Sequence, residues 1–160
     1  MKIGVLSDTH SSQSTDALVR IAKGSFSDVS LIIHAGDLTS MAVLDVFSDR
    51  QVIAVCGNKD RKPISDFLPE RQILNANGYR IGVVHGWGGR KGIEERVMSC
   101  FDDVHCIVYG HTHKPNNRIH CGILLFNPGA FSGSRFLKRN PTAGILTIGN
   151  GISGNIIKVA

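Results

Sequence analysis

The sequence contains no apolar run that approaches the ~20 residues a helix needs to span a bilayer. Its first apolar stretch, residues 1–6, is too short for a signal peptide and leads directly into Ser7 and Asp8. These two absences predict a cytoplasmic protein that does not enter a membrane. Only 19% of the 160 residues are charged and 42% are hydrophobic, which argues against disorder and predicts one globular domain over residues 1–160.

The cysteines form neither a Cys-x-x-Cys pair nor a framework of the kind that secreted proteins use. Cys100 and Cys106 could be combined with His105 and His120 into a zinc cluster, but the spacing matches no standard pattern. We therefore predict buried structural thiols at Cys56, Cys100, Cys106 and Cys121.

The chain also has no continuous basic segment that would indicate a nucleic-acid interface. Its net charge of +5 is modest, and the densest basic stretches are residues 59–62 and 135–139. We interpret the positive charge as a source of mild attraction for a small anionic substrate. We do not expect nucleic acid to be a partner. In contrast, the 18 glycines exceed the usual share of ~7%, which indicates tight turns or backbone close to a ligand.

Short β-branched segments alternate with helical windows over the first two thirds of the chain, which predicts parallel strands joined by helices. The last third has strand patterns separated by turns, which predicts antiparallel additions. We expect an α/β domain of two packed sheets with helices outside. The predicted strands are 2–6, 31–34, 51–55, 80–84, 105–109, 123–126, 144–148 and 155–159, and the predicted helices are 14–23, a helix capped by Ser40 and 92–101.

Polar side chains follow each of the first five predicted strands, next to glycine or a small residue. In α/β sheets, ligands bind at the carboxyl ends of the strands, so five such segments build one cluster. A single Asp after a strand is usually a turn residue, but polar segments after five strands in the same structural position favour a binding site. The segments are residues 7–10, 36–37, 57–60, 85–86 and 110–113.

These segments supply more ligands than one tetrahedral ion can use, and a pair of ions sharing a carboxylate accounts for the number. Asp37 is the predicted bridge, because a carboxylate can offer one oxygen to each ion. Carboxylate, amide and imidazole ligands suit manganese, iron, zinc or nickel. The predicted ligands are Asp8, His10, Asp37, Asn58, His85, His111 and His113.

In this order the motifs resemble those of the calcineurin-like metallophosphoesterases. The short length and the Gly-His-Thr-His-Lys-Pro form of residues 110–115 are similar to the small prokaryotic phosphodiesterase branch. The resemblance extends to about residue 131 and includes the Asn-Pro-Gly turn at 127–129. It implies a four-layer αββα sandwich of two mixed sheets flanked by helices. Small members of this family are often dimers or larger, so a homo-oligomer is left open.

The resemblance also implies a phosphodiesterase that hydrolyses a small phosphodiester with a metal-bound hydroxide. Manganese is the expected metal, with nickel, iron, zinc and cobalt as alternatives. Asp37, Asn58 and His85 are the residues we expect to be catalytic. By position, Asp8, His10, Asp37 and His113 would hold the first ion, and Asp37, Asn58, His85 and His111 the second.

The residue after Asn58 departs from the pattern of the wider superfamily. Many members have a histidine there that protonates the leaving group, whereas this chain has Lys59. A lysine can hold a phosphate oxygen but is a sluggish acid. We therefore expect higher activity on diesters with good leaving groups than on alkyl monoesters.

A non-catalytic metal-binding scaffold of the same fold is the alternative, since a eukaryotic retromer subunit resembles this family but works through protein contacts. That alternative predicts lost ligands, and every predicted ligand is present. Substrate choice would depend on loops 60–71 and 87–91, whose sequences contain no readable code.

Several further residues near the motifs receive weaker predictions. His34 is either a buried partner of a ligand or a core residue, and Arg135 either reaches substrate phosphate or lies at the surface. We expect His105 and His120 at strand edges without a chemical role. Loop support is predicted for Thr9, Asp60 and Thr112.

Overall fold

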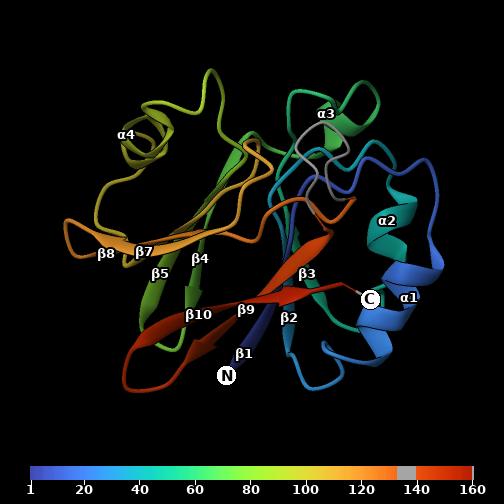
Figure 1. Cartoon of the computed structure of the whole chain (residues 1–160), viewed down its shortest axis with the longest axis horizontal. Coiled ribbons are helices and arrows are strands. Elements are labelled where there is room, and N and C mark those ends of the chain that lie inside the picture. Colours follow the sequence, from blue (N-terminus) through green and yellow to red (C-terminus); the bar gives the residue numbers. More distant parts are fainter. Residues whose placement is uncertain (133–139, 160) are drawn as a thin grey trace.

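The computed structural model describes residues 1–132 and 140–159, which form two five-stranded sheets packed face to face (Figure 1). The first sheet contains β1 (Lys2–Leu6), β2 (Leu31–His34), β3 (Gln51–Ala54), β9 (Thr142–Ile148) and β10 (Ile152–Lys158). The second sheet contains β4 (Arg71–Ala76), β5 (Tyr79–Val84), β6 (Cys106–Val108), β7 (Asn116–His120) and β8 (Ile123–Asn127). The strand order is β10-β9-β1-β2-β3 in the first sheet and β4-β5-β6-β8-β7 in the second.

Each sheet combines parallel and antiparallel pairs, as the change of pattern along the sequence predicts. Strands β1, β2 and β3 run parallel, and so do β5, β6 and β8. The hairpin β9–β10 is added antiparallel to β1. Because parallel strands end at the same edge, the loops after β1, β2 and β3 lie together, and those after β5 and β6 lie together.

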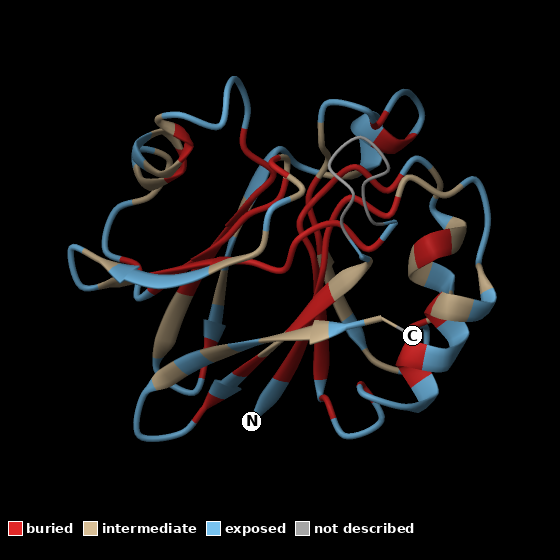
Figure 2. Cartoon of the chain, viewed as in Figure 1, coloured by how far each residue is buried: buried red, intermediate tan, exposed pale blue. Residues whose placement is uncertain are grey.

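Three apolar layers hold the sheets and helices together. The central layer lies between the sheets and includes Ile33, Val83 and Phe126. The outer face of the first sheet is covered by α1 (Asp16–Lys23) and α2 (Ala42–Asp45), and that of the second by α4 (Ile93–Met98). This confirms the αββα sandwich. Figure 2 shows that burial continues from the strands into several of the loops at their ends.

The helices are shorter than the sequence predicts, and one begins differently. The Thr15 side chain accepts the Leu18 N–H and caps α1, which therefore begins at Asp16. Ser40 is not the N-cap of α2, because Met41 occupies that position; the Ser40 hydroxyl oxygen accepts the Ala42 N–H instead. A fourth short helix, α3 (Ile64–Phe67), lies in the segment expected to be a loop.

Among the described residues, none of the helices is long and apolar enough to cross a membrane.

Two strands were not predicted, and both lie at an edge of the second sheet. β7 is largely polar and mostly exposed, and β4 alternates exposed residues with partly buried ones, so neither has the continuous buried apolar pattern of the central strands. Two-residue turns with positive φ join them to their neighbours, Asn77-Gly78 before β5 and Cys121-Gly122 before β8. The Asn-Gly dipeptide was the available sequence signal for the first hairpin.

The prediction of four buried cysteines was wrong for three of them. Cys106 is buried, while Cys56 and Cys100 are partly exposed and Cys121 is exposed in its turn. Apolar surroundings raise the pKa of the buried Cys106 thiol. The turn explains Cys121, because a residue at the tip of a hairpin has little core to pack against.

Candidate metal centre

The polar segments predicted from the sequence meet at one place, between the two sheets. Asp8 follows β1, Asp37 follows β2 and Asn58 follows β3, all in the first sheet. His85 follows β5, and residues 111–113 follow β6, in the second. Backbone hydrogen bonds join neighbouring loops beyond the strands: the Asp8 N–H donates to the Gly36 carbonyl (3.0 Å), and the Gly110 N–H to the His85 carbonyl (3.0 Å). The cluster is therefore assembled by backbone pairing as well as by side chains.

The backbone at this cluster adopts a conformation that side chains other than glycine rarely take. Non-glycine residues with positive φ are uncommon and concentrate at functional sites. Glycines nearby allow close approach: a Cβ on Gly110 would lie 2.8 Å from Asp8 Oδ2, and one on Gly36 2.8 Å from His85 Nδ1. The predicted ligands with left-handed φ are Asp8 (52°), His10 (44°), Asp37 (57°), His111 (68°) and His113 (55°).

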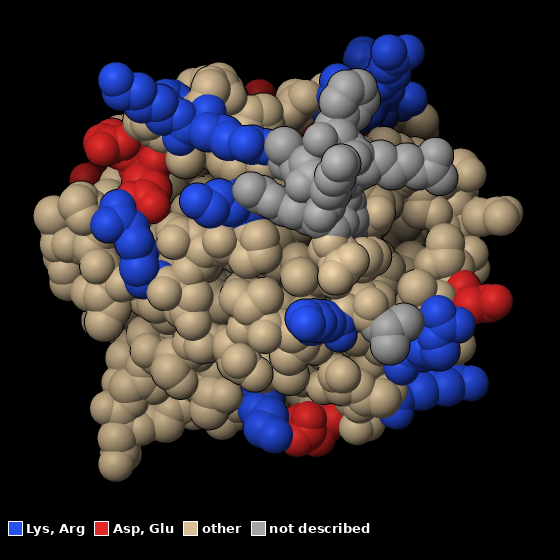
Figure 3. All heavy atoms as spheres, in the orientation of Figure 1, with Lys and Arg blue, Asp and Glu red and all other residues tan. Residues whose placement is uncertain are grey.

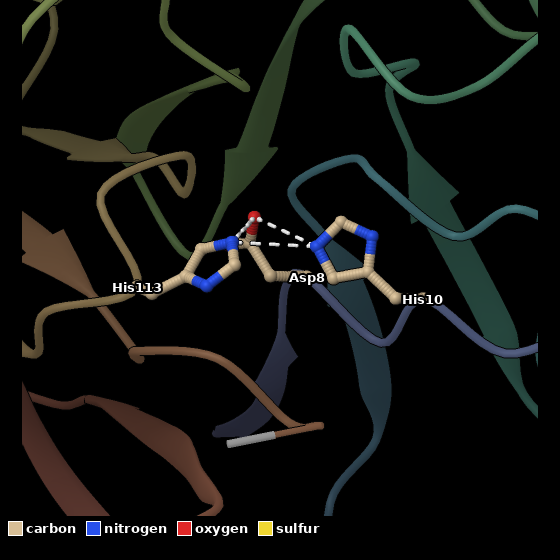
Figure 4. Close-up of side chains that lie close together, drawn as sticks. All are labelled: Asp8, His10 and His113. Carbon is tan, nitrogen blue, oxygen red and sulfur yellow. Dashed lines mark hydrogen bonds and ion pairs between the residues drawn. The ribbon is translucent and has the colours of Figure 1, made fainter. Parts of the chain in front are cut away.

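Asp8, His10 and His113 form one compact group (Figure 4). His113 Nε2 lies 3.1 Å from Asp8 Oδ1, and His10 Nε2 lies 3.8 Å from the same oxygen. The two imidazole Nε2 atoms are 3.3 Å apart. The Asp8 side chain is fully buried, whereas both histidines are partly open to solvent. The three ligand atoms thus converge on one point.

A second group contains Asp8 again, with Asp37 and His85. His85 Nε2 lies 3.3 Å from Asp37 Oδ2, and His10 Nε2 lies 3.8 Å from the same oxygen, so Asp37 Oδ2 faces both halves of the cluster. Asp37 Oδ1 accepts the Lys59 N–H at 2.7 Å. Asp37 thus lies between the two groups, with Oδ2 directed at their histidines and Oδ1 hydrogen-bonded to the backbone of the Asn58 loop.

The nitrogen that His85 presents to the cluster is defined by its other hydrogen bond. Its Nδ1 donates to the Ala35 carbonyl at 2.7 Å, which leaves Nε2 directed at Asp37. Burial alone would lower the pKa of His85, but the nearby carboxylates of Asp37 and Asp8 outweigh it and raise the pKa. In the same way, burial opposes ionisation of Asp37, and His85 and the Lys59 amide nonetheless lower its pKa.

Asn58 and His111 extend the second half of the cluster. His111 Nε2 donates to the Gly88 carbonyl at 2.8 Å, so the lone pair of the neutral ring is at Nδ1. That nitrogen lies 3.0 Å from Asn58 Oδ1, and the His111 ring packs edge-on against His85. Two acceptor atoms that face each other at this distance are a suitable pair of ligands for a cation.

Buried polar residues hold the ligand loops in place. Asp60 Oδ2 accepts the N–H groups of Asp37 (2.9 Å) and Gly57 (2.8 Å), and its Oδ1 accepts that of Thr39 (2.7 Å). The predicted support of the loop by Asp60 is confirmed. Thr9 Oγ1 donates to the Leu38 carbonyl at 3.4 Å.

The loops on the other side of the cluster are held similarly. Thr112 Oγ1 accepts the Lys114 N–H, and Asn127 Nδ2 donates to the Gly110 carbonyl at 2.7 Å. Ser7 was missed by the sequence analysis: its Oγ lies 2.6 Å from Asp8 Oδ2. Its position directly before Asp8 was the only available signal.

Two of the three remaining histidines with weak predictions lie on β7 or next to β6, and the third lies behind the ligand loops. His34 is fully buried, with Nε2 3.2 Å from Thr9 Oγ1, so it supports the Asp8–His10 loop from within the core. His105 precedes β6, and His120 ends the edge strand β7. Arg135 lies outside the described residues.

The donor atoms fit divalent cations on a direct structural criterion. Among the described residues, the buried side-chain atoms without a hydrogen-bond partner include Asp8 Oδ1 and His85 Nε2, and both face the centre of the cluster. Burying a polar atom without a partner is costly, and a metal ion would satisfy both. The described residues contain no comparable group of histidine, cysteine and carboxylate ligands elsewhere.

The surface charge does not form one continuous basic area on the face shown in Figure 3. Lys and Arg side chains lie there in separate groups, with uncharged surface between them. This distribution agrees with the scattered positions of these residues in the sequence.

Comparison with known proteins gives a consistent family relationship. The family model for the calcineurin-like phosphoesterase superfamily domain matches residues 1–151. A probable metallophosphoesterase of Methanocaldococcus jannaschii is 38% identical over 134 residues, which cover 81% of this chain and 68% of that protein. A phosphodiesterase of the same organism is 32% identical over 163 residues, covering 91% and 92%.

Solved structures share the fold. The structure of Entamoeba histolytica Vps29 complexed with Zn²⁺ superposes with a TM-score of 0.74, covering 100% of both chains at 21% identity. At this identity the similarity establishes the architecture and not the activity. This chain thus has relatives named as phosphoesterases and a structural neighbour named Vps29.

Proposed function

The chain belongs to the calcineurin-like phosphoesterase superfamily, and on that basis we propose that it is a phosphodiesterase with a dinuclear divalent-metal centre. The proposal rests above all on one observation: Asp8 Oδ1 and His85 Nε2 are buried, lack hydrogen-bond partners among the described residues and face the same point. When bound, two divalent cations would supply an activated water and neutralise charge on a phosphoryl group. Manganese is the metal we expect, with nickel, iron, zinc and cobalt as alternatives.

Each half of the cluster has a set of residues suited to one ion. Asp8, His10 and His113 would hold the first, with Asp37 Oδ2 shared between the two. Asn58, His85 and His111 would complete the second set. The Ala35 and Gly88 carbonyls accept hydrogen bonds from His85 and His111 and so determine which imidazole nitrogen faces the cluster. These ligands are therefore positioned before an ion arrives.

Lys59 occupies the position that would otherwise hold a proton donor for the leaving group. Its backbone N–H is used by Asp37 Oδ1, while its exposed side chain lines a cavity together with Arg61 and Lys62. That cavity contains none of the proposed metal ligands in its wall, and a lysine is a weak proton donor. We therefore propose small phosphodiesters with good leaving groups as the substrate class.

The experiment is hydrolysis by protein stripped of metal and then reloaded with one metal at a time. The substrates are bis(p-nitrophenyl) phosphate, p-nitrophenyl phosphate, an alkyl monoester and cyclic nucleotides. We expect no turnover before reloading, and faster turnover of the aryl diester than of the alkyl monoester after it. Faster turnover of the alkyl monoester would contradict the diesterase proposal. Metal binding without hydrolysis of any substrate would favour the scaffold alternative.

A further inference from the structure

A cavity of about 410 Å³ opens directly beside the proposed second metal position. Asn58 and His85, two ligands of that position, form part of its wall. Pockets for small organic molecules typically have volumes of ~300–1,000 Å³ and apolar walls with a few polar groups. The rest of this wall is built from Cys56, Glu70, Arg71, Val84, Trp87 and Cys100.

Trp87 is the most distinctive residue of this wall. It is the sole tryptophan of the chain, and it follows the ligand His85 by two positions. The residue is 48% exposed, so a large part of its surface is available to a partner. Indole faces stack on planar aromatic groups, including nucleobases.

The segment that carries Trp87 is held in place at both ends. From α4, Arg96 Nε donates to the Trp87 carbonyl (2.8 Å) and Arg96 Nη1 to the Lys91 carbonyl (3.2 Å). The Gly88 carbonyl accepts from His111, a proposed ligand. The backbone that carries the exposed indole is thus hydrogen-bonded to Arg96 and to the proposed ligand His111. A binding surface that is held in place before the ligand arrives loses little entropy on binding.

Another part of the wall offers polar groups that suit the edge of a planar ring. β4 pairs antiparallel with β5 and places Arg71 opposite Val84, which brings Glu70 and Arg71 beside the His85 loop. The Arg71 guanidinium donates to the Cys100 carbonyl at 3.2 Å, which closes this side of the cavity. A guanidinium and a carboxylate on one wall provide both donors and acceptors.

We infer that this cavity binds a nucleobase carried by the substrate, with Trp87 as a stacking and specificity-determining residue. The phosphate of such a ligand lies at the metal ligands Asn58 and His85, and the base stacks on Trp87 in the cavity that Glu70 and Arg71 also line. The position of the phosphate rests on the proposed function, whereas recognition of the base does not. The ligand class is therefore a nucleoside phosphate.

The test uses the tryptophan fluorescence of the metal-loaded protein, excited at a wavelength that Tyr79 and Tyr109 do not absorb, so that Trp87, the sole tryptophan of the chain, supplies the signal. Adenosine 5′-monophosphate and ribose 5-phosphate have the same sugar phosphate and differ in the base. We expect saturable quenching by the nucleotide, and no comparable quenching by ribose 5-phosphate at equal concentration. Equal responses to both, or no response to either, would overturn the inference.

Variants examined by calorimetry separate stacking from a general loss of structure. Trp87→Ala should weaken binding of the nucleotide by roughly tenfold, while Trp87→Phe, which retains a ring, should recover most of it. Both should leave the affinity for ribose 5-phosphate within about twofold, because the phosphate contacts remain. Phe67→Ala, which removes a 73% exposed ring outside this cavity, is the matched control and should bind like the wild type. Unchanged nucleotide affinity in Trp87→Ala would overturn the assignment.

The two proposals can fail separately. A protein that hydrolyses phosphodiesters but does not distinguish the nucleotide from ribose 5-phosphate would retain the proposed function and lose this inference. A protein that shows base-dependent quenching without hydrolysing any diester would retain the inference and lose the proposed function.

Discussion

His34 lies directly behind the metal-ligand loops, although it is not itself among the proposed ligands. It ends β2, is fully buried, and its Nε2 lies 3.2 Å from the hydroxyl of Thr9, the residue between Asp8 and His10. Because Thr9 Oγ1 donates to the Leu38 carbonyl, His34 Nε2 acts as the donor toward Thr9. The neutral imidazole therefore connects the core of the first sheet to the Asp8–His10 loop.

We expect His34 to make the metal-free protein sensitive to acid. Burial, which is the main cause, lowers the pKa of His34 from 6.5 to about 3. A group with a depressed folded pKa stabilises the protein above its unfolded pKa, and this stability is lost as the pH falls from about 6.5 toward 3. The loss is roughly 5 kcal/mol at most. The measurement is the free energy of unfolding in urea at a series of pH values.

His34→Gln should flatten that dependence between pH 6.5 and 4, whatever its own effect on stability at pH 7. The control is His105→Gln, which alters an exposed histidine and should leave the slope unchanged. A His34→Gln protein with the full wild-type slope would show that other groups cause the acid sensitivity.

Between elements, the two sheets approach each other closely where Phe126 of β8 meets glycines of the facing sheet. A Cβ on Gly144 of β9 would lie 2.5 Å from the Phe126 ring, and one on Gly154 of β10 would also clash with it. Both glycines lie in strands, where glycine normally weakens a sheet, so their presence follows from the lack of space. The contact defines how the sheets pack below the metal centre.

Gly144→Ala should therefore destabilise the protein by about 1–3 kcal/mol, the usual cost of overpacking. The free energy of unfolding in urea measures the effect. Combining it with Phe126→Leu should give a total loss smaller than the sum of the single losses, because the clash is relieved. Gly149→Ala serves as the control, since a Cβ there meets no atom within 4 Å. Strictly additive losses would indicate that the ring is not the cause.

The sequence predicts elements well where burial imposes a pattern, and poorly where it does not. The central strands have continuous apolar segments that end in polar motifs, so both the sandwich and the meeting of Asp8, Asp37 and His85 could be anticipated. The edge strand β7 is mostly exposed and polar, and β4 is only partly buried, so neither has a continuous apolar segment that would distinguish it from a loop.

Details of the site that depend on packing across two sheets could not be predicted. Asp37 Oδ2 is the oxygen left to face His10 and His85 because the Lys59 amide occupies the other one. The rigidity of the Trp87 segment follows from Arg96, a residue nine positions away on a helix. Neither contact corresponds to a residue spacing that could be recognised as a motif in the sequence.

For the whole molecule, the main consequence is that the proposed metal centre connects the two sheets. Asp8, His10, Asp37 and Asn58 come from loops of the first sheet, and His85, His111 and His113 from loops of the second. Bound ions would therefore cross-link the halves of the sandwich. They would also compensate the buried Asp8 oxygen that lacks a partner among the described residues.

We accordingly expect Mn²⁺ to stabilise the folded protein. A ligand that binds only the native state at 100 times its Kd contributes about 2.7 kcal/mol. The melting temperature of the stripped protein should rise by several degrees when Mn²⁺ is added, and a potassium salt at equal ionic strength should not reproduce the increase. An identical melting temperature with and without Mn²⁺ would argue against ions that join the sheets.

The central claim is tested most directly by counting bound Mn²⁺ per chain during titration of the stripped protein while following hydrolysis of bis(p-nitrophenyl) phosphate. We predict two ions per wild-type chain, with activity appearing as the second binds. Asp37→Ala should bind at most one ion and lose activity by at least about a hundredfold. Asp103→Asn, a change at an exposed carboxylate paired with Arg80, should retain both ions and full activity. An Asp37→Ala protein with two bound ions and undiminished hydrolysis would contradict the account.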